Sequence, residues 1–159
     1  GEACGNALEV EESIHCLRGE GPKDLRELTL AQAAEMLFVA KVVPTVMDGR
    51  ERAEAALSSG AALDKFRSII QAQGGHPGVV DNPGGLLPRA PIRARVEAAR
   101  AGIVQRVEPR AIGRAIIALG GGRTRVEDDI DPAVGIVLHV RPGVRVERGQ
   151  PHRHRARAR

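Results

Sequence analysis

A proline- and glycine-rich stretch divides the 159-residue chain into two halves with different sequence patterns. HPGVVDNPGGLLPRAP, residues 76–91, contains four Pro and three Gly, which interrupt both helices and strands. Before it, apolar residues recur every three or four positions, as is typical of helices. After it, apolar and polar residues alternate, as is typical of strands. The stretch therefore predicts a linker between two modules.

The first half predicts four amphipathic helices joined by short loops. The apolar spacing and the flanking Gly, Ser and Pro residues place these helices at residues 7–18, 23–41, 48–58 and 61–73. The broadest apolar face belongs to the second of them and is formed by Leu25, Leu28, Ala33, Met36, Leu37 and Ala40. Helices of this kind form one packed layer.

The second half predicts a small α+β module of order β-β-α-β-β. Alternation places strands at residues 92–98, 102–107 and 135–140, and a further short strand follows the turn in RPGVRVERGQP. Pro109 begins a helix that ends at the glycines of residues 120–122. The fold class that we expect is α/β.

The formal net charge of +4 is located at one end of the chain. It equals the charge of four arginines, Arg153, Arg155, Arg157 and Arg159, because the other 20 basic residues balance 20 acidic ones. We expect this HRHRARAR tail to be disordered. The chain has two Phe and neither Trp nor Tyr, so it has few aromatic side chains that could stack on nucleic-acid bases. We therefore expect no nucleic-acid partner.

Two further observations concern the location of the protein in the cell. No segment approaches the roughly 20 apolar residues of a membrane span, so we expect no membrane association. Cys4 and Cys16 are too few for a disulfide framework and match no metal-site spacing. Reduced thiols and a cytoplasmic location are the expectation.

The run GNALEVEES contains the most informative polar residues. Asn6 and Glu9 have the spacing of a capping box, in which each side chain accepts from the other's backbone N–H. Glu12 lies one turn further along the same helix. It is either a solvated carboxylate favoured by the helix dipole or a cation ligand that joins carbonyls of the preceding turn.

Two other segments are better explained by structure than by chemistry. GGGR, residues 120–123, lies at the carboxyl end of a predicted helix, where carbonyls are exposed, and so predicts a helix C-cap and not an anion site. VEDDID, residues 126–131, lacks the alternating ligands of a calcium loop and predicts a solvated turn.

Three segments in this order resemble the C-terminal half of the pyrimidine nucleoside phosphorylases, which include thymidine phosphorylase. They are GNALEVEESIHCLRGEGPKDLREL, SGAALDKFRSIIQAQGG and AIGRAIIALGGGRTRVEDDIDPAVGIVLHVRPGVRVERGQP. The resemblance runs from Gly1 to about Pro151. It implies that residues 1–82 are the closing helices of the phosphorylase α/β domain and that residues 88–151 are a C-terminal hammerhead-like domain, followed by the disordered tail, residues 152–159.

The resemblance implies the activity of a pentosyltransferase of pyrimidine nucleoside salvage, a cytoplasmic homodimer. In this reaction, inorganic phosphate cleaves a pyrimidine nucleoside to free base and (deoxy)ribose 1-phosphate. In the family, the residues that hold phosphate and base lie upstream of the matching region. No catalytic or substrate-binding residue of this chain is therefore assigned, and we expect the chain alone to be inactive.

One family site does carry over to residues of this chain. Some members bind a monovalent cation, potassium, through a backbone carbonyl before GNALEV and a Glu in the following helix. These positions correspond to Ala3 and Glu12. No other cofactor is implied.

The end of the chain departs from the family pattern. After GQP the family continues with an apolar strand, whereas this chain continues PHRHRARAR. A truncated or frame-shifted gene is the expectation. The alternative hypothesis is a non-enzymatic hammerhead interaction module whose Arg-rich tail binds polyanions.

Overall fold

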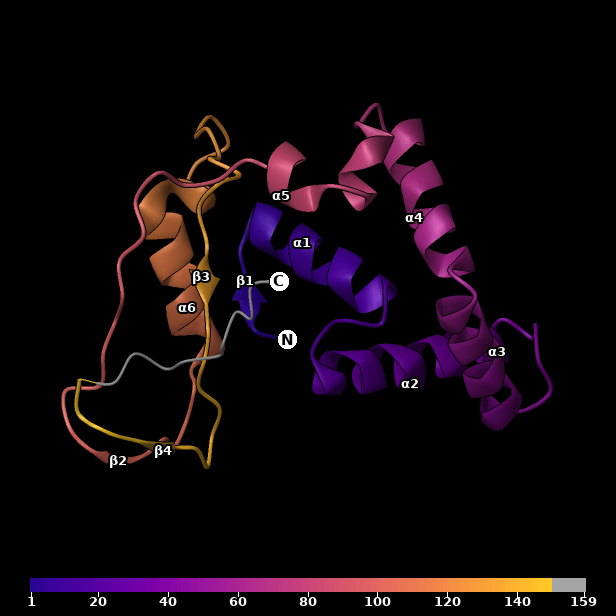
Figure 1. Ribbon diagram of the computed structural model, residues 1–159, viewed down its shortest axis with the longest axis horizontal. Coiled ribbons are helices and arrows are strands. Elements are labelled where there is room, and N and C mark those ends of the chain that lie inside the picture. Colours follow the sequence, from indigo (N-terminus) through magenta and orange to yellow (C-terminus); the bar gives the residue numbers. More distant parts are fainter. Residues whose placement is uncertain (150–159) are drawn as a thin grey trace. The chain divides into compact units, whose positions relative to one another are not determined.

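The computed structural model describes residues 1–149, which form two compact units (Figure 1). The first unit consists of Gly1 and Glu9–Leu87, and the second of Glu2–Leu8 and the residues from Pro88 onward. Helices and small sheets are both present, which confirms the α/β class. The assignment of residues 1–82 and 88–151 to two phosphorylase domains stays a prediction, and the tail, residues 152–159, lies outside the described residues.

Four longer α-helices of the first unit each confirm a predicted helix to within two residues. They are α1 (Asn6–Leu17, which enters this unit at Glu9), α2 (Lys23–Val39), α3 (Val46–Ser58) and α4 (Ala61–Ala72). The earlier start of α3 has a local cause, because the Thr45 side chain accepts a hydrogen bond of 3.2 Å from the Asp48 N–H. Such an N-cap satisfies a helix donor that would otherwise lack a partner.

The predicted linker is wrong for residues 76–87, which fold into two short helices. These are the 3₁₀-helix η1 (Pro77–Val80) and the one-turn helix α5 (Pro83–Leu86). Both begin with Pro, whose fixed φ suits the first helical position, and the His76 and Asn82 side chains cap them. The same residue types that interrupt long helices here start short ones.

The core of the first unit includes this segment. Val79 and Val80 are buried against Ile14 of α1, and five partly buried apolar residues pack around these three: Val10, Leu63, Phe66, Ile70 and Leu87. Buried apolar side chains of this kind supply most of the folding free energy. Residues 77–80 are therefore part of the helical unit and not a spacer.

The described part of the second unit contains two small antiparallel sheets and the helix α6 with its continuation η2 (Figure 1). Strand β1 (Ala3–Cys4) pairs with β3 (Ile136–Val137), and β2 (Gly102–Ile103) pairs with β4 (Arg145–Val146). Helix α6 (Pro109–Ile116) continues as a π-helical turn, η2 (Ile117–Gly121). Three of the four predicted strands are present in shortened form, and the predicted helix is confirmed.

The predicted strand at residues 92–98 is wrong. The segment lies outside the strands, with the Ile92 and Val96 side chains 82% and 91% exposed. Within residues 1–149, the backbone groups of residues 92–97 make no backbone hydrogen bond, although the Ala98 carbonyl accepts from Gly149 at 3.1 Å. A segment with alternating apolar and polar residues forms a strand only when a neighbouring strand supplies backbone hydrogen bonds.

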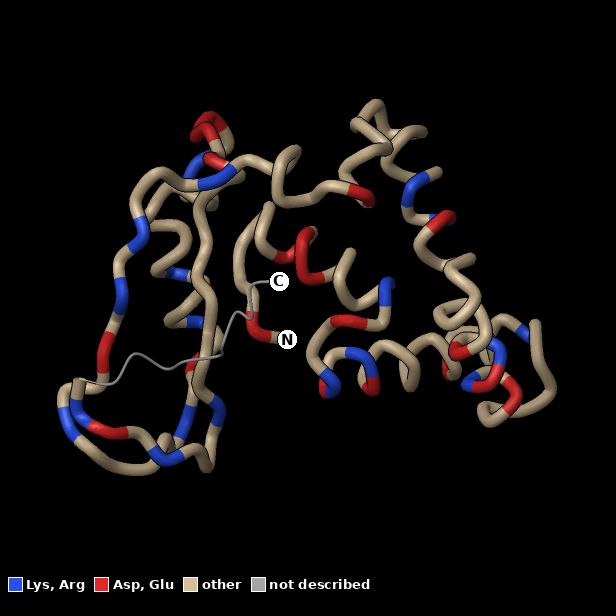
Figure 2. The backbone as a smooth tube through the Cα atoms, viewed as in Figure 1, with Lys and Arg blue, Asp and Glu red and all other residues tan. Residues whose placement is uncertain are grey.

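Charge is distributed unequally between the units (Figure 2). The first unit has 8 basic and 12 acidic residues, whereas residues 2–8 and 88–149 have 12 arginines and 8 acidic residues. The zero net charge of residues 1–149 is therefore the sum of a net charge of −4 on the first unit and +4 on residues 2–8 and 88–149. No helix within residues 1–149 has the length and apolar character needed to cross a membrane.

Candidate functional site

The segment before α1 is anchored to the second unit by backbone hydrogen bonds. β1 pairs antiparallel with β3 in the register Ala3↔Val137 and Cys4↔Ile136. The ladder continues one residue further, because the Leu138 N–H donates to the Glu2 carbonyl at 2.8 Å. The predicted cation ligand Ala3 is thus held in a fixed backbone position.

The register decides where the Ala3 carbonyl points. In an antiparallel pair, opposite residues alternate between hydrogen-bonded and non-hydrogen-bonded pairs. Since Glu2 and Leu138 form a hydrogen-bonded pair, Ala3 and Val137 form a non-hydrogen-bonded one. The Ala3 carbonyl therefore points away from β3, an orientation compatible with metal ligation.

Gly5 connects β1 to α1 in a conformation that favours glycine. Its φ is +118°, and a Cβ there would lie 2.7 Å from both the Gly135 Cα and the Val134 carbonyl oxygen. The first turn of α1 is then fixed from outside, because the Ala7 N–H donates to the Pro132 carbonyl at 3.1 Å. Direct backbone contact of this kind sets the position at which α1 begins.

Asn6 makes a contact that the sequence did not indicate. Its side-chain amide donates to the Gly121 carbonyl at 3.1 Å, across 115 residues of sequence. α1 begins at Asn6 itself, and the capping box with Glu9 stays a prediction. The chain thus uses Asn6 to join the start of α1 to the end of η2.

The C-cap interpretation of residues 120–123 is confirmed. Gly120 has a φ of +94°, and its carbonyl accepts from the Asp131 N–H at 2.9 Å. Carbonyls, and not N–H groups, are therefore the groups that this helix end presents to its neighbours, as a C-cap requires.

The solvated turn at residues 126–131 is also confirmed. The Asp128 carboxylate accepts from the Thr124 N–H, the Thr124 hydroxyl and the Arg125 N–H at 2.9, 2.7 and 2.9 Å. These hydrogen bonds, first that of the Thr124 hydroxyl, hold the pKa of Asp128 below its usual range. The acidic cluster orders its own turn.

Glu12, the second predicted cation ligand, lies in the part of α1 that belongs to the first unit. Its carboxylate lies beside Gly1, since a Cβ on Gly1 would be 2.5 Å from Glu12 Oε2. Burial, and next the charge of Glu12, raise the pKa of the nearby Cys16 thiol. Ala3 and Glu12 belong to different units, and their joint role stays a prediction.

Two of the histidines have polar partners. His15 Nδ1 lies 3.0 Å from Glu20 Oε2, and the His76 ring accepts from the Gly78 N–H at 3.1 Å. No disulfide joins Cys4 to Cys16. Within residues 1–149 no three His, Cys, Asp or Glu side chains gather in a way that could hold a metal ion.

Two arginines that the sequence reasoning missed hold η1 in place. Arg18 donates to the Val80 carbonyl and to the Asp81 carbonyl, the latter at 3.0 Å. Arg67 makes a two-pronged pair with the Asp81 carboxylate at 2.5 and 2.8 Å. No local pattern indicates these contacts, because they depend on where η1 packs.

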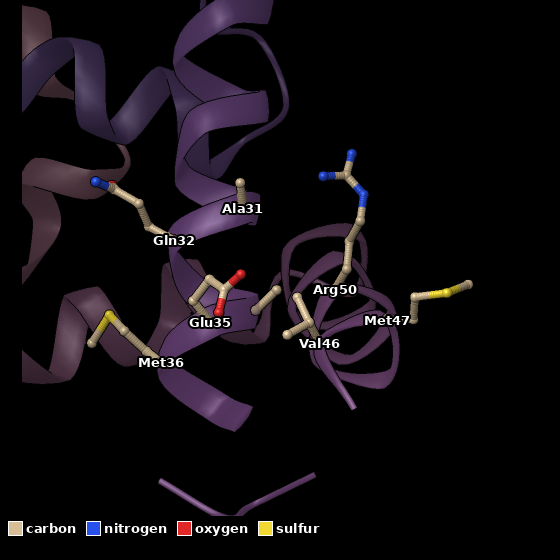
Figure 3. A pocket seen from close by; sticks show the side chains of 8 residues that line it. Ala31, Gln32, Glu35, Met36, Val46, Met47 and Arg50 are labelled. Carbon is tan, nitrogen blue, oxygen red and sulfur yellow. The ribbon is translucent and has the colours of Figure 1, made fainter. Parts of the chain in front are cut away.

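Two apolar grooves lie among the helices of the first unit. One, of about 690 Å³, is lined by residues of α2 and α3, among them Met36, Val46 and Met47 together with Glu35 and Arg50 (Figure 3). The other, of about 400 Å³, is lined by residues of α1 to α4, mainly Ala and Leu. We assign no catalytic role to either groove.

The described residues define a mixed α/β protein in which a helical unit is combined with a small β module that holds the N-terminal strand. Residues 103–152 match the family model of the "Pyrimidine nucleoside phosphorylase C-terminal domain". The pyrimidine-nucleoside phosphorylase of Bacillus subtilis (strain 168) is 44% identical over 151 residues, which cover 95% of this chain and 35% of the relative. That of Staphylococcus aureus (strain USA300) is 44% identical over 150 residues, which cover 94% and 34%.

The chain therefore belongs to the pyrimidine nucleoside phosphorylase family. It spans about a third of the length of the curated relatives that it matches.

Proposed function

We propose that this chain contributes the C-terminal part of an enzyme that cleaves pyrimidine nucleosides with inorganic phosphate. The observation that carries the proposal is the 44% identity over 95% of the chain. In the reaction, a phosphate oxygen forms a bond to C1′ and the bond from C1′ to the pyrimidine nitrogen breaks. The electron pair of that bond goes to the base, which leaves and is protonated.

The chemistry needs groups that bind phosphate and stabilise charge on the departing base. We assign neither task to a residue of this chain. The role that we assign is positional: the β1–α1 connection, fixed by β3 and by the contacts of Gly5 and Asn6, holds the Ala3 carbonyl at a defined place within the second unit. The resemblance also supports a cytoplasmic homodimer for the complete enzyme.

We propose further that Ala3 and Glu12 are ligands of a monovalent cation, potassium. A carbonyl oxygen and a carboxylate are the donors that a hard cation prefers. The direction of the Ala3 carbonyl, away from β3, and the exposure of part of Glu12 support this role. The cation would supply positive charge close to the bound anion.

A chimera tests the proposed activity. Residues 1–149 replace the matching region of the Bacillus subtilis enzyme, and release of uracil or thymine from uridine or thymidine is followed by chromatography in the presence of phosphate. We expect phosphate-dependent release by the chimera and none by the chain alone. A folded chimera without release would overturn the activity, and release by the chain alone would contradict its expected inactivity.

The cation assignment has its own readout in the same chimera. Potassium should raise the midpoint of thermal unfolding, and Glu12→Gln should increase the half-effective potassium concentration about tenfold or more, because it removes a charged ligand. Glu11→Gln, one position away on α1, is the matched control. Equal potassium responses of the two variants would remove Glu12 from the site.

A further inference from the structure

Helix α2 has two apolar faces, of which one packs within the first unit. Leu30 and Ala34, one turn apart, are its buried residues. The Ala34 side approaches α3 closely, since a Cβ on Gly49 would lie 2.6 Å from the Ala34 carbonyl oxygen. The pairing of α2 with α3 therefore accounts for this first face.

The second face lies on the opposite side of the helix and carries four apolar residues, which we call the α2 stripe: Leu25, Leu28, Met36 and Val39. The polar Gln32 lies between Leu28 and Met36 on this face. Residues eleven apart lie about three full turns apart and share a face, as Leu28 and Val39 do. Leu30 follows Leu28 by two positions, and Ala34 precedes Met36 by two. Each of these steps turns roughly 200° around the helix. The stripe therefore lies on the side of α2 opposite its buried residues, Leu30 and Ala34.

The stripe is exposed in the described part of the chain. Leu28, Met36 and Val39 are 57%, 71% and 73% exposed, and Leu25 is half-buried. Figure 3 shows Met36 and Gln32 extending from α2 away from α3, while Met47 extends from α3 to the other side. A helix that is apolar on both faces is characteristic of a protein interior.

We infer that the α2 stripe is an internal interface of the complete phosphorylase and that it packs against the part of the enzyme outside the matching region. The inference rests on the proposed function, because the family identifies what covers the stripe. About two thirds of each relative lies outside the region that this chain matches, which is enough to bury a helix face. Met36, with its adaptable side chain, suits the centre of such a contact.

Cysteine labelling in the isolated chain and in the chimera tests the inference. Met36→Cys and Met47→Cys are compared, because Met47 is 76% exposed, similar to Met36, but lies on α3 outside the stripe. Maleimide labelling at each position is measured by peptide mass spectrometry. We expect residue 36 to react about tenfold or more slowly in the chimera than in the isolated chain, as burial in a stable interface requires. Residue 47 should react alike in both.

Equal labelling of residue 36 in the two proteins would overturn the inference. So would concentration-dependent protection of residue 36 in the isolated chain, which would assign the stripe to a second copy. If the chimera does not fold, the remaining part of the Bacillus subtilis enzyme is co-expressed with this chain as a separate polypeptide. Met36→Glu with Val39→Glu should then abolish co-purification and Met47→Glu should preserve it; any other pattern contradicts the inference.

The labelling result is independent of turnover. A chimera that releases base but labels freely at residue 36 would keep the proposed function and reject the interface. A chimera that protects residue 36 but releases no base would keep the interface and reject the proposed function.

Discussion

At the scale of single residues, two helix-interior glycines have opposite surroundings. A Cβ on Gly49 of α3 would meet the Ala34 carbonyl oxygen at 2.6 Å and the Ala34 Cα at 3.1 Å, whereas a Cβ on Gly113 of α6 would meet nothing within 4 Å. Gly49→Ala should therefore destabilise the first unit by about 1–3 kcal/mol through forced separation of α2 and α3. Gly113→Ala should stabilise the second by roughly 0.5–1 kcal/mol, because alanine favours helix.

Urea unfolding, followed by hydrogen exchange in peptides of each unit, measures both changes. Each variant serves as the control for the other, since both place the same methyl group inside a helix. A stabilising Gly49→Ala would show that α2 and α3 do not depend on the close approach at this position.

At the scale of elements, the packing of η1 depends on the ionised Asp81 carboxylate. The hydrogen bond from Arg67 holds the pKa of Asp81 below its usual range. Because the folded-state pKa is depressed, the stabilisation is fully present above the unfolded-state pKa of about 3.9 and is lost as the pH falls through the folded value. Asp81→Asn should remove this contribution at neutral pH and flatten the acid-dependent loss of stability.

The difference in urea midpoint between wild type and Asp81→Asn, measured from pH 6 down to pH 3, gives the test. It should be largest at pH 6 and shrink toward pH 3. Asp64→Asn, which removes another carboxylate near Arg67 on α4, is the matched control and should change little. A midpoint difference that stays constant with pH would show that ionisation of Asp81 is irrelevant to η1.

The elements also show which parts of the fold local sequence can predict. The four helices of the first unit follow from apolar spacing, because a helix satisfies its own backbone groups. Strand 92–98 was wrong, and the two-residue strand β1 was missed, because a strand depends on a distant partner that alternation does not identify. The role of residues 76–87 was missed because Pro signals helix starts as well as breaks.

The candidate site was less predictable than the helices. Ala3 and Glu12 came from family resemblance, and the capping and dipole arguments at α1 left Glu12 open between two roles. The contact from Asn6 to Gly121 spans 115 residues, so no spacing rule contains it. Arg18 and Arg67 bind carbonyl and carboxylate groups of a segment whose position only packing defines.

At the scale of the whole molecule, a segment near the start of the chain belongs to the same unit as the second half of the chain. Residues 2–8 complete the second unit through β1, which supplies the pairing partner of β3 more than 130 residues later. Charge follows the same division, with a net +4 on residues 2–8 and 88–149 and a net −4 on the rest of residues 1–149. The zero net charge of residues 1–149 is thus the sum of two oppositely charged units.

Removal of β1 should therefore destabilise the second unit and leave the first intact. Deletion of residues 1–4 leaves β3 without its partner, so exchange protection at residues 136–138 should fall to that of an exposed strand edge, while α2 and α3 keep theirs. Gly5→Ala should act in the same direction, because its Cβ would meet the Gly135 Cα at 2.7 Å. Glu2→Ala, which removes the side-chain ion pair with Arg141 but keeps the backbone of the strand, should have a smaller effect than the deletion. Unchanged protection at residues 136–138 after the deletion would mean that β3 is held by the second unit without the N-terminal strand.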